Sequence, residues 1–308
     1  MKAEIERRAN LSHREFTEEY LYPNRPVIVT DAIRQWKAVA RWTPEFFKTE
    51  FRELTFTIND RERGQTGYKA KGNVEYTMER FIDRVLDSTD ETPAPYFRNR
   101  VLYETFPTLR EDIEPLPGYY FPNWLPESFW LPKVQSVFNR GAQIEIYIGG
   151  RGGAFPVLHY DGLASHAFLV QIYGQKKFII YSPEQKRNMY PVPGQPNISQ
   201  IADVEHPDLE RFPLFGQAEA VSFVLDPGEV LFIPSRWWHA TKMLTPCISI
   251  STNVVNQSNW AALTDFVANN RNPLMGIPSR AYLNLAGFWR SMRDRRIGFD
   301  RTNSWKAR

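Results

Sequence analysis

Short stretches of alternating apolar and polar residues dominate the middle of the chain. Ile144, Ile146 and Ile148 alternate with Glu145 and Tyr147, which is the period of a strand with one buried face. Further strands are predicted, in chain order, at 167–173, 177–181, 220–225, 230–234 and 247–254. Glycine- and proline-containing turns separate these runs, as at 149–153 and 226–229. Many short strands joined by turns predict a β-sandwich or barrel rather than a doubly wound parallel sheet.

The chain before this strand-rich region mixes helices and strands. Strands are predicted at 26–30 and 54–58, and a helix at 77–86. Thr43 followed by Pro44 and an acid in the first turn predicts the start of another helix, with the threonine as its N-cap. We interpret residues 1–140 as an α/β lead-in that packs on a core formed by residues 141–256.

The pattern returns to helix after the last predicted strand. Helices are expected at 260–269 and at about 279–292, which places them in a C-terminal segment, 257–308. The second helix has large apolar residues at helical spacing: Tyr282, Leu285, Phe288 and Met292. Such a face needs a covering surface, which either the chain's own core or a second copy of the chain would provide.

Composition then excludes several classes of protein. Of the 308 residues, 42% are hydrophobic and 24% charged, which is typical of a globular chain. A net charge of +3 is too small and scattered to indicate a nucleic-acid partner. No apolar run of about 18 residues is present, so no membrane span is expected. The single cysteine, Cys247, excludes an internal disulfide framework, and the polar N-terminus is unlike a signal peptide, so we expect a cytoplasmic protein.

Three residues form a candidate metal site. His159 and Asp161 are two positions apart, so an extended backbone directs both side chains to the same face. His239 follows 80 positions after His159, behind the apolar run 230–234 and two tryptophans. Two imidazoles and one carboxylate are the ligand set of non-haem iron(II) oxygenases, which leave positions open for a bidentate co-substrate and dioxygen.

Each part of this set has an ordinary structural alternative. Most His-x-Asp pairs are solvated or hydrogen-bonded, and His239 beside two tryptophans is also consistent with a core histidine. The order of the parts is more specific: a glycine-rich turn, His-x-Asp, strands, a Pro-Gly-Glu turn and Trp-Trp-His. Of the other histidines, we expect His166 on a loop or rim and His206 in solvent, and His13 has no evident role.

At these residues the sequence resembles the Jumonji-C, cupin-like branch of the 2-oxoglutarate dioxygenases, in particular the factor-inhibiting-HIF type of asparaginyl hydroxylase and its bacterial relatives. The stretches that carry the resemblance are 159–161, 170–177, 189–191, 208–213, 226–234, 237–239 and 248–253. They cover the region from about 140 to 256. The resemblance implies a mainly β fold with flanking helices, built on a double-stranded β-helix (jelly-roll) core.

The resemblance also implies cofactors and their ligands. It implies iron(II) held by His159, Asp161 and His239, with 2-oxoglutarate as co-substrate and dioxygen as oxidant. Lys176 matches the family lysine that binds the distal carboxylate, whereas its neighbour Lys177 is expected on the opposite face of the strand. Tyr96 and Asn253 match further residues near the co-substrate, although each is equally consistent with a structural role.

Two positions depart from the family pattern in the co-substrate shell. Pro156 stands where the family often has a threonine, and Ala167 where it has an asparagine.

The expected function is hydroxylation of a protein or peptide side chain, coupled to decarboxylation of 2-oxoglutarate to succinate and CO2. The alternatives are the same chemistry on a small molecule, such as an amino acid or natural product, and a non-catalytic cupin-like binding module. Lysine demethylation is compatible with the motifs, but no reader domain or zinc-binding segment accompanies the core. By resemblance, the C-terminal helices are expected to form a homodimer.

Overall fold

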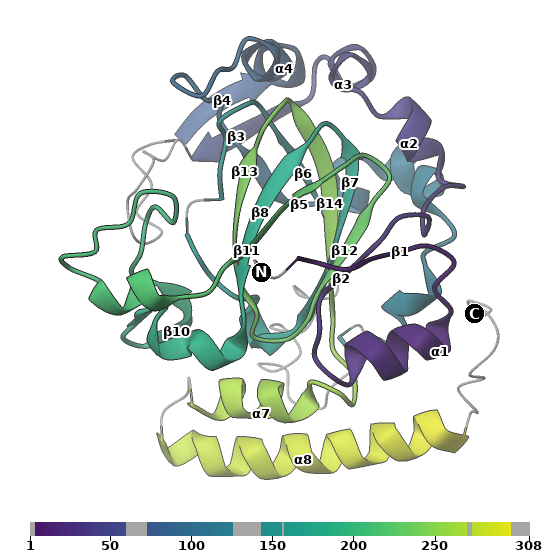
Figure 1. Ribbon diagram of the computed structural model, residues 1–308. Coiled ribbons are helices and arrows are strands. Elements are labelled where there is room, and N and C mark those ends of the chain that lie inside the picture. Colours follow the sequence, from purple (N-terminus) through teal and green to yellow (C-terminus); the bar gives the residue numbers. More distant parts are fainter. Residues whose placement is uncertain (1–3, 60–72, 126–142, 156, 270–272, 297–308) are drawn as a thin grey trace.

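The computed structural model describes residues 4–59, 73–125, 143–155, 157–269 and 273–296, and its core is a jelly roll of two facing sheets (Figure 1). The larger sheet has seven strands, in the spatial order β1 (Arg7–Arg8), β2 (Val27–Val29), β12 (Val230–Ile233), β7 (His166–Tyr173), β14 (Cys247–Val254), β6 (Ile144–Gly149) and β5 (Phe97–Val101). The smaller sheet has the order β11 (Val221–Leu225), β8 (Lys176–Tyr181), β13 (Trp238–Met243). The chain passes repeatedly between the sheets, which confirms the predicted double-stranded β-helix.

The alternation along β6 divides this strand into two chemically different faces. Ile144, Ile146 and Ile148 are buried on the outer face of the larger sheet, against side chains of the N-terminal segment. Glu145 and Tyr147 are only partly buried and point the other way, into the barrel. The outer face therefore provides the main hydrophobic core, and the inner face is free to carry polar chemistry.

A second apolar cluster holds the two sheets together at the opposite edge of the barrel. Phe178 and Ile180 of β8 lie in one buried cluster with Leu231 and Ile233 of β12. The ring of Phe178 stacks on Phe223 of β11, with centroids 5.7 Å apart and planes 6° from parallel. The barrel is thus apolar at this edge.

The N-terminal segment is built into the larger sheet as well as packed on it. Its strands β1, β2 and β5 form both ends of that sheet, and its hairpin pairs β3 (Thr55–Asn59) with β4 (Asn73–Thr77). Its helices are α1 (His13–Phe16), η1 (Thr17–Leu21), α2 (Lys37–Arg41), α3 (Pro44–Glu50), α4 (Met78–Leu86), α5 (Leu102–Thr105), η2 (Pro107–Ile113) and η3 (Gly118–Tyr120). As predicted, the Thr43 side chain caps α3 by accepting a hydrogen bond from the backbone N–H of Phe46.

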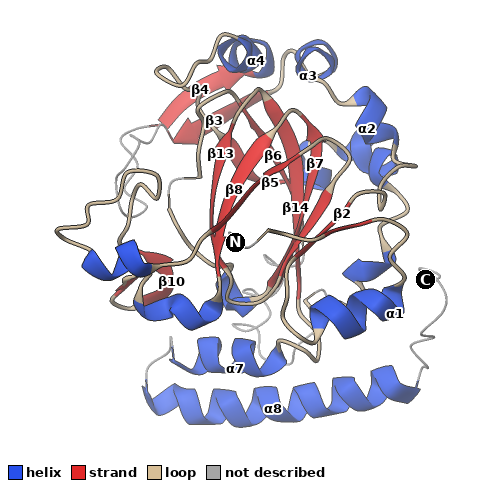
Figure 2. Cartoon of the chain, in the orientation of Figure 1, coloured by secondary structure: helices blue, strands red, loops and turns tan. Residues whose placement is uncertain are grey.

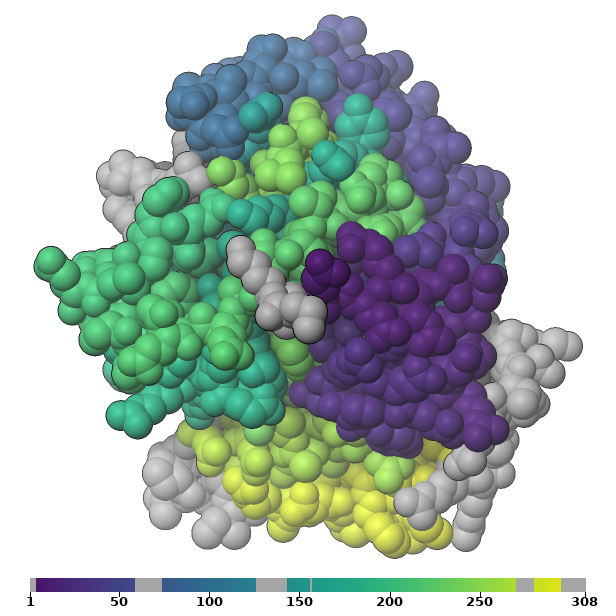
Figure 3. Space-filling view, viewed as in Figure 1, coloured from purple at the N-terminus to yellow at the C-terminus, as the bar shows by residue number. Residues whose placement is uncertain are grey.

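An insertion between β8 and β11 of the smaller sheet covers that sheet's outer face. It consists of η5 (Pro183–Arg187), the hairpin β9 (Pro191–Val192) and β10 (Gln195–Ser199), and η6 (Pro213–Gln217). The short helix η4 (Gly162–Ala164) precedes β7. In the space-filling view the insertion and the N-terminal segment occupy opposite sides of the front face, with the C-terminal helices below them (Figure 3).

The C-terminal helices α7 (Trp260–Asn269) and α8 (Pro273–Arg296) lie side by side across one end of the barrel (Figures 1 and 2). The apolar face predicted on α8 is only partly covered by the described chain: Tyr282 packs on the buried cluster between α7 and α8. Leu283 is the fully buried residue, whereas Leu285 and Phe288 are 59% and 57% exposed. Gly287 permits this close approach of α8 to α7, because a Cβ at that position would lie 2.2 Å from the indole nitrogen of Trp260. Within the described ranges, no helix is both long and apolar enough to span a membrane.

Candidate active site

The three predicted metal ligands meet at one end of the barrel. His159 and Asp161 lie on the segment before β7, and His239 is the second residue of β13. One ligand atom from each residue can be chosen so that all lie within 4.8 Å of one another. Nε2 of His239 lies 3.9 Å from Oδ2 of Asp161, a separation that one ion with bonds of about 2.0–2.2 Å can bridge.

Backbone pairing brings the two histidines together although they are 80 positions apart. The N–H of His239 donates to the carbonyl of His159 at 2.7 Å, and the N–H of His159 donates back at 3.2 Å. The two imidazole centroids are 4.4 Å apart. On its other side, the His159 ring stacks on Phe155 at 4.5 Å, which fixes the imidazole plane.

Both imidazoles are oriented to bind a metal through Nε2. Nδ1 of His159 lies 3.0 Å from the carbonyl of Val157, and Nδ1 of His239 lies 3.1 Å from the carbonyl of Trp237. A carbonyl can only accept, so Nδ1 carries the proton in each ring and Nε2 keeps its lone pair. Burial, with a smaller contribution from neighbouring His239, holds the pKa of His159 well below its usual range, so this ring is neutral at pH 7. The donor set therefore fits a divalent transition metal.

The loop after Asp161 is held in a strained shape by hydrogen bonds from distant segments. Leu163 and Ala164 both have positive φ, 60° and 50°, which is unfavourable for residues other than glycine. The carbonyl of Ala164 accepts hydrogen bonds from Ser235 Oγ at 2.7 Å and Asn259 Nδ2 at 3.2 Å. These bonds fix the backbone that leads from Asp161 into β7.

Asn253 belongs to the same network. The sequence suggested either a co-substrate contact or a structural role, and its Nδ2 lies 2.6 Å from Ser165 Oγ, which donates to the carbonyl of Gly162. Asn253 thus contacts the loop after Asp161, and its role toward co-substrate stays a prediction.

The expectation for His166 is wrong. It is the first residue of β7 and only 1% exposed, not a rim residue. Burial lowers its pKa to about 3, so it is neutral. Its Nδ1 accepts from the backbone N–H of Ser235, and its Nε2 lies 2.8 Å from Ser258 Oγ. Both nitrogens are used for structure, and His166 lies outside the metal cluster. His206 is exposed, as expected.

Lys176 lies in a buried polar pocket of the same barrel. It is 3% exposed, and its ammonium donates to Ser249 Oγ at 2.5 Å and lies 5.9 Å from the centre of the Tyr147 ring. Burial lowers its pKa to about 8, and among the described residues no carboxylate forms an ion pair with it. Lys177 points to the other face, where it pairs with Glu205 at 2.7 Å. A buried cation lacking a counter-ion fits the distal carboxylate of a dicarboxylic acid.

Tyr96 lies beside the same pocket. Its ring centre is 6.0 Å from that of Tyr147, and burial raises the pKa of its phenol, so the hydroxyl is a neutral donor. A Cβ at Gly149 would lie 3.0 Å from the Tyr96 ring, so this glycine makes room for it. Of the two departures from the family pattern, Ala167 is buried in the apolar cluster between the sheets, and Pro156 lies outside the described residues.

Two inward-facing residues near the metal cluster were not anticipated from the sequence. Glu145 accepts hydrogen bonds from the Tyr147 hydroxyl at 2.5 Å and Asn99 Nδ2 at 3.3 Å. Burial, with a smaller contribution from the charge of Asp161, raises the pKa of Glu145. Arg98 lies over the outer face of Phe155, 5.1 Å from its ring centre. The alternation along β6 was the sequence feature that could have predicted an inward-facing Glu145, because it places this residue on the face opposite the isoleucines.

The chain is similar to cupin-like proteins and to Jumonji-C proteins of several organisms. Residues 13–261 match the family model for the cupin-like domain. Lysine-specific demethylase 8 of Danio rerio is 31% identical over 244 residues, which cover 77% of this chain and 54% of that protein. Arginine-specific demethylase JMJ20 of Arabidopsis thaliana is 24% identical over 275 residues, which cover 83% of this chain and 58% of that protein. Human tRNA wybutosine-synthesizing protein 5 is 24% identical over 243 residues, which cover 73% of this chain and 70% of that protein. The chain spans about half the length of the first curated relatives that it matches.

Proposed function

This chain belongs to the cupin-like, Jumonji-C family of iron(II)- and 2-oxoglutarate-dependent oxygenases, and we propose that it hydroxylates a side chain of a protein or peptide. Enzymes of this family use Fe(II), 2-oxoglutarate and dioxygen. The observation that carries the proposal is the combination of two Nε2 atoms and one carboxylate, aimed at a common point, with the buried, uncompensated ammonium of Lys176 in the same barrel.

Each residue has a distinct task in this proposal. His159, Asp161 and His239 would hold the iron, and co-substrate and dioxygen would take the ligand positions that these three residues do not fill. Lys176 binds the far carboxylate of 2-oxoglutarate through a charge-assisted hydrogen bond, with Ser249 beside it. When bound, the metal and co-substrate supply the oxidising chemistry: 2-oxoglutarate and dioxygen yield succinate and CO2, and one oxygen atom enters a substrate C–H bond. The protein positions these groups and limits the access of water.

A non-catalytic binding module is a less favoured hypothesis than an oxygenase. A domain that only bound a ligand would have no need of a metal-binding triad with both Nδ1 atoms engaged by carbonyls. The same chemistry on a small molecule stays an alternative, because the described site leaves the size of the substrate open. The proposal also places the reaction in the reducing cytoplasm, with which the free thiol of Cys247 is consistent.

Demethylation is a second candidate, and Glu145 favours it. A carboxylate that faces the metal cluster from β6 suits a substrate with a cationic side chain, and two relatives are named as lysine- and arginine-specific demethylases. Hydroxylation of an N-methyl carbon gives a hemiaminal that breaks down to formaldehyde and the demethylated amine. The two candidates therefore share one oxidation step and differ in whether the oxygen stays on the substrate.

The full chain tests both candidates in one experiment. It is supplied with iron(II), 2-oxoglutarate and 18O2, together with unmodified and N-methylated peptides and a metabolite extract. Mass spectrometry should find a peptide that gains one 18O atom, with an equal amount of succinate. Formaldehyde release with loss of a methylene mass supports demethylation, and oxygen gain on a metabolite supports the small-molecule alternative. Asp161→Ala is the control, and succinate formation at the wild-type rate in that variant would refute the site.

A further inference from the structure

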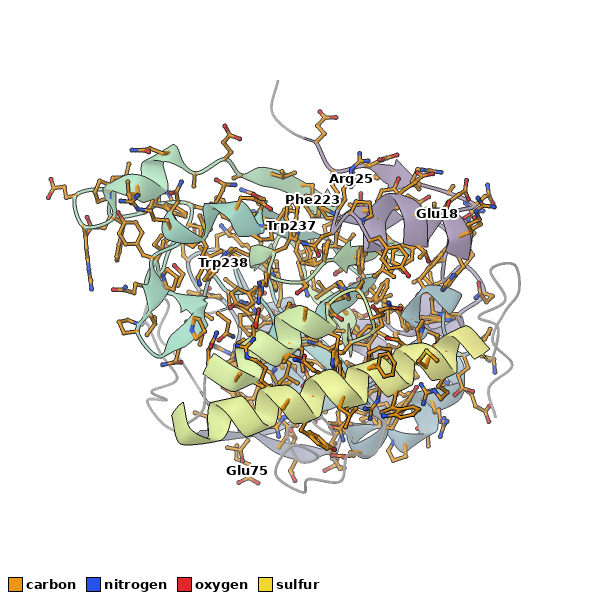
Figure 4. The ribbon with its side chains drawn as sticks, turned by 90° about the horizontal axis from the view of Figure 1, so that it is seen from below. Glu18, Arg25, Glu75, Phe223, Trp237 and Trp238 are labelled. Atoms are coloured by element: carbon orange, nitrogen blue, oxygen red, sulfur yellow. The ribbon has the colours of Figure 1, made fainter. Side chains whose placement is uncertain are left out.

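A second cavity lies behind the metal cluster, on the outer face of the smaller sheet. It encloses about 490 Å³, within the range of small-molecule sites. Its walls come from the insertion, from the turn before β13 and from α7. The lining residues include Tyr160, Lys186, Arg236, Trp238, Asp265 and Phe266. Figure 4 labels Trp238 in this region, seen from the side of α7 and α8.

The floor of this cavity is the reverse side of the metal site. Tyr160 stands between His159 and Asp161, and Trp238 directly precedes His239. In an extended chain, neighbouring side chains point to opposite faces, so these two rings point away from the metal cluster. They meet edge to face with centroids 5.0 Å apart. An occupant of the cavity would therefore contact the residues that adjoin all three candidate metal ligands.

The cavity carries an excess of positive charge. Lys186 is exposed, and Arg236 lies 3.7 Å from Asp265. Asp265 is also bound by Arg280 at 2.5 Å, so two guanidinium groups share one carboxylate and Lys186 has no ion pair with it among the described residues. Arg236 is held at φ 65°, a conformation that favours glycine, and its Nη2 donates to the carbonyl of Ala262. Arg236 thus lines the cavity from a strained backbone position, with its guanidinium held against α7.

We propose that this cavity is a second ligand site, back to back with the metal site, for a small planar organic anion. The rings of Tyr160, Trp238 and Phe266, with two prolines, provide flat apolar walls for an aromatic body. Lys186 and Arg236 bind its carboxylate or other anionic group. The proposal does not depend on the reaction catalysed, and it assigns the site to an accessory or regulatory ligand rather than to co-substrate.

Three probes of the same shape and different charge test this proposal: indole-3-acetate, indole-3-acetamide and tryptamine. Binding to the full chain is measured by calorimetry without oxygen, with iron(II) and saturating 2-oxoglutarate present so that the metal site is filled. The acid should bind at least tenfold more tightly than the amide, and the amine should bind more weakly than either. Saturating 2-oxoglutarate should not displace the acid, because the two sites lie on opposite faces.

Variants locate the bound acid. Lys186→Met and Arg236→Gly should each weaken its binding about fivefold or more and leave amide binding unchanged. Glycine adopts a φ of 65° without strain, so Arg236→Gly removes the guanidinium without adding backbone strain. Arg187→Met is the matched control, since Arg187 is exposed beside Lys186 and does not line the cavity. Equal binding of acid and amine, displacement by 2-oxoglutarate, or an equal loss in Arg187→Met would each overturn the proposal.

Discussion

Replacing Lys176 by methionine should selectively damage co-substrate binding. Methionine keeps most of the length and apolar volume of the lysine stem and removes the ammonium that donates to Ser249. The distal carboxylate of 2-oxoglutarate would then be buried without its cation. Loss of a hydrogen bond between charged groups costs roughly 1.5–3 kcal/mol, which weakens binding about 10- to 150-fold. Iron binding should be unchanged, because Lys176 is not part of the metal cluster.

The pH dependence provides an independent measure of the same contact. Burial lowers the pKa of free Lys176 to about 8, so the ammonium is mostly present at pH 7 and mostly absent at pH 9. Only the protonated form attracts the carboxylate. The wild-type affinity for 2-oxoglutarate should therefore fall about tenfold between pH 7 and pH 9. The methionine variant has no group to titrate, so its weaker affinity should not change over this range.

The assay is calorimetric titration of 2-oxoglutarate into anaerobic iron(II)-loaded protein from pH 6.5 to pH 9, with iron content measured on the same samples. Lys177→Met is the matched control, because that side chain points outward and pairs with Glu205. The reasoning is refuted if Lys177→Met weakens binding as much as Lys176→Met does. A pH dependence that persists unchanged in Lys176→Met would refute the assignment of the titrating group.

Three further predictions concern the metal, the buried acid and the exposed helix face. His159→Ala and Asp161→Ala should each abolish succinate formation and reduce bound iron, measured by metal analysis, and wild-type turnover in both would contradict the triad. Burial raises the pKa of Glu145, so the folded state holds this proton more tightly than the unfolded chain does. The folded state therefore loses stability as the pH rises from the unfolded to the folded pKa of Glu145. Glu145→Gln should raise the Tm at pH 7, and thermal scans should show this gain shrinking toward pH 4. If a second copy covers the exposed Leu285 and Phe288, Leu285→Arg should convert dimer to monomer in light scattering, and a wild-type mass near 36 kDa at all concentrations would exclude the dimer.

Sequence patterns predicted the elements whose structure depends on residues that are close in sequence. The alternation at 144–148 and the cap at Thr43 both appear in the structure as expected. The strand β13, which carries His239, was not predicted. Its residues Ala240, Thr241 and Lys242 are all half-buried and show no alternation, because the strand is ordered by pairing with β8 and not by a face of its own.

The remaining differences come from contacts between distant segments. Large apolar residues at helical spacing on α8 did not reveal that the helix packs on α7 through Leu283 and the small residue Gly287, which leaves Leu285 and Phe288 exposed. Similarly, nothing local to His166 indicates that Ser235 and Ser258 will occupy both of its nitrogens. Sequence reasoning located the candidate ligands from their spacing, but it could not identify the network that holds the loop beside them.

The division of β6 into two faces explains how a barrel of this size can hold a buried polar site. Burying Glu145, Tyr147 and Lys176 costs free energy, because each polar group loses water and only part of that loss is recovered by hydrogen bonds. The opposite face of the same strand buries Ile146 and Ile148 under the N-terminal segment, which stabilises the fold at a place where no ligand has to bind. In a small barrel packed only from inside, the core and the site would compete for one interior. Here the larger hydrophobic core lies outside the barrel, between the larger sheet and the N-terminal segment, so a polar barrel interior is compatible with a stable fold.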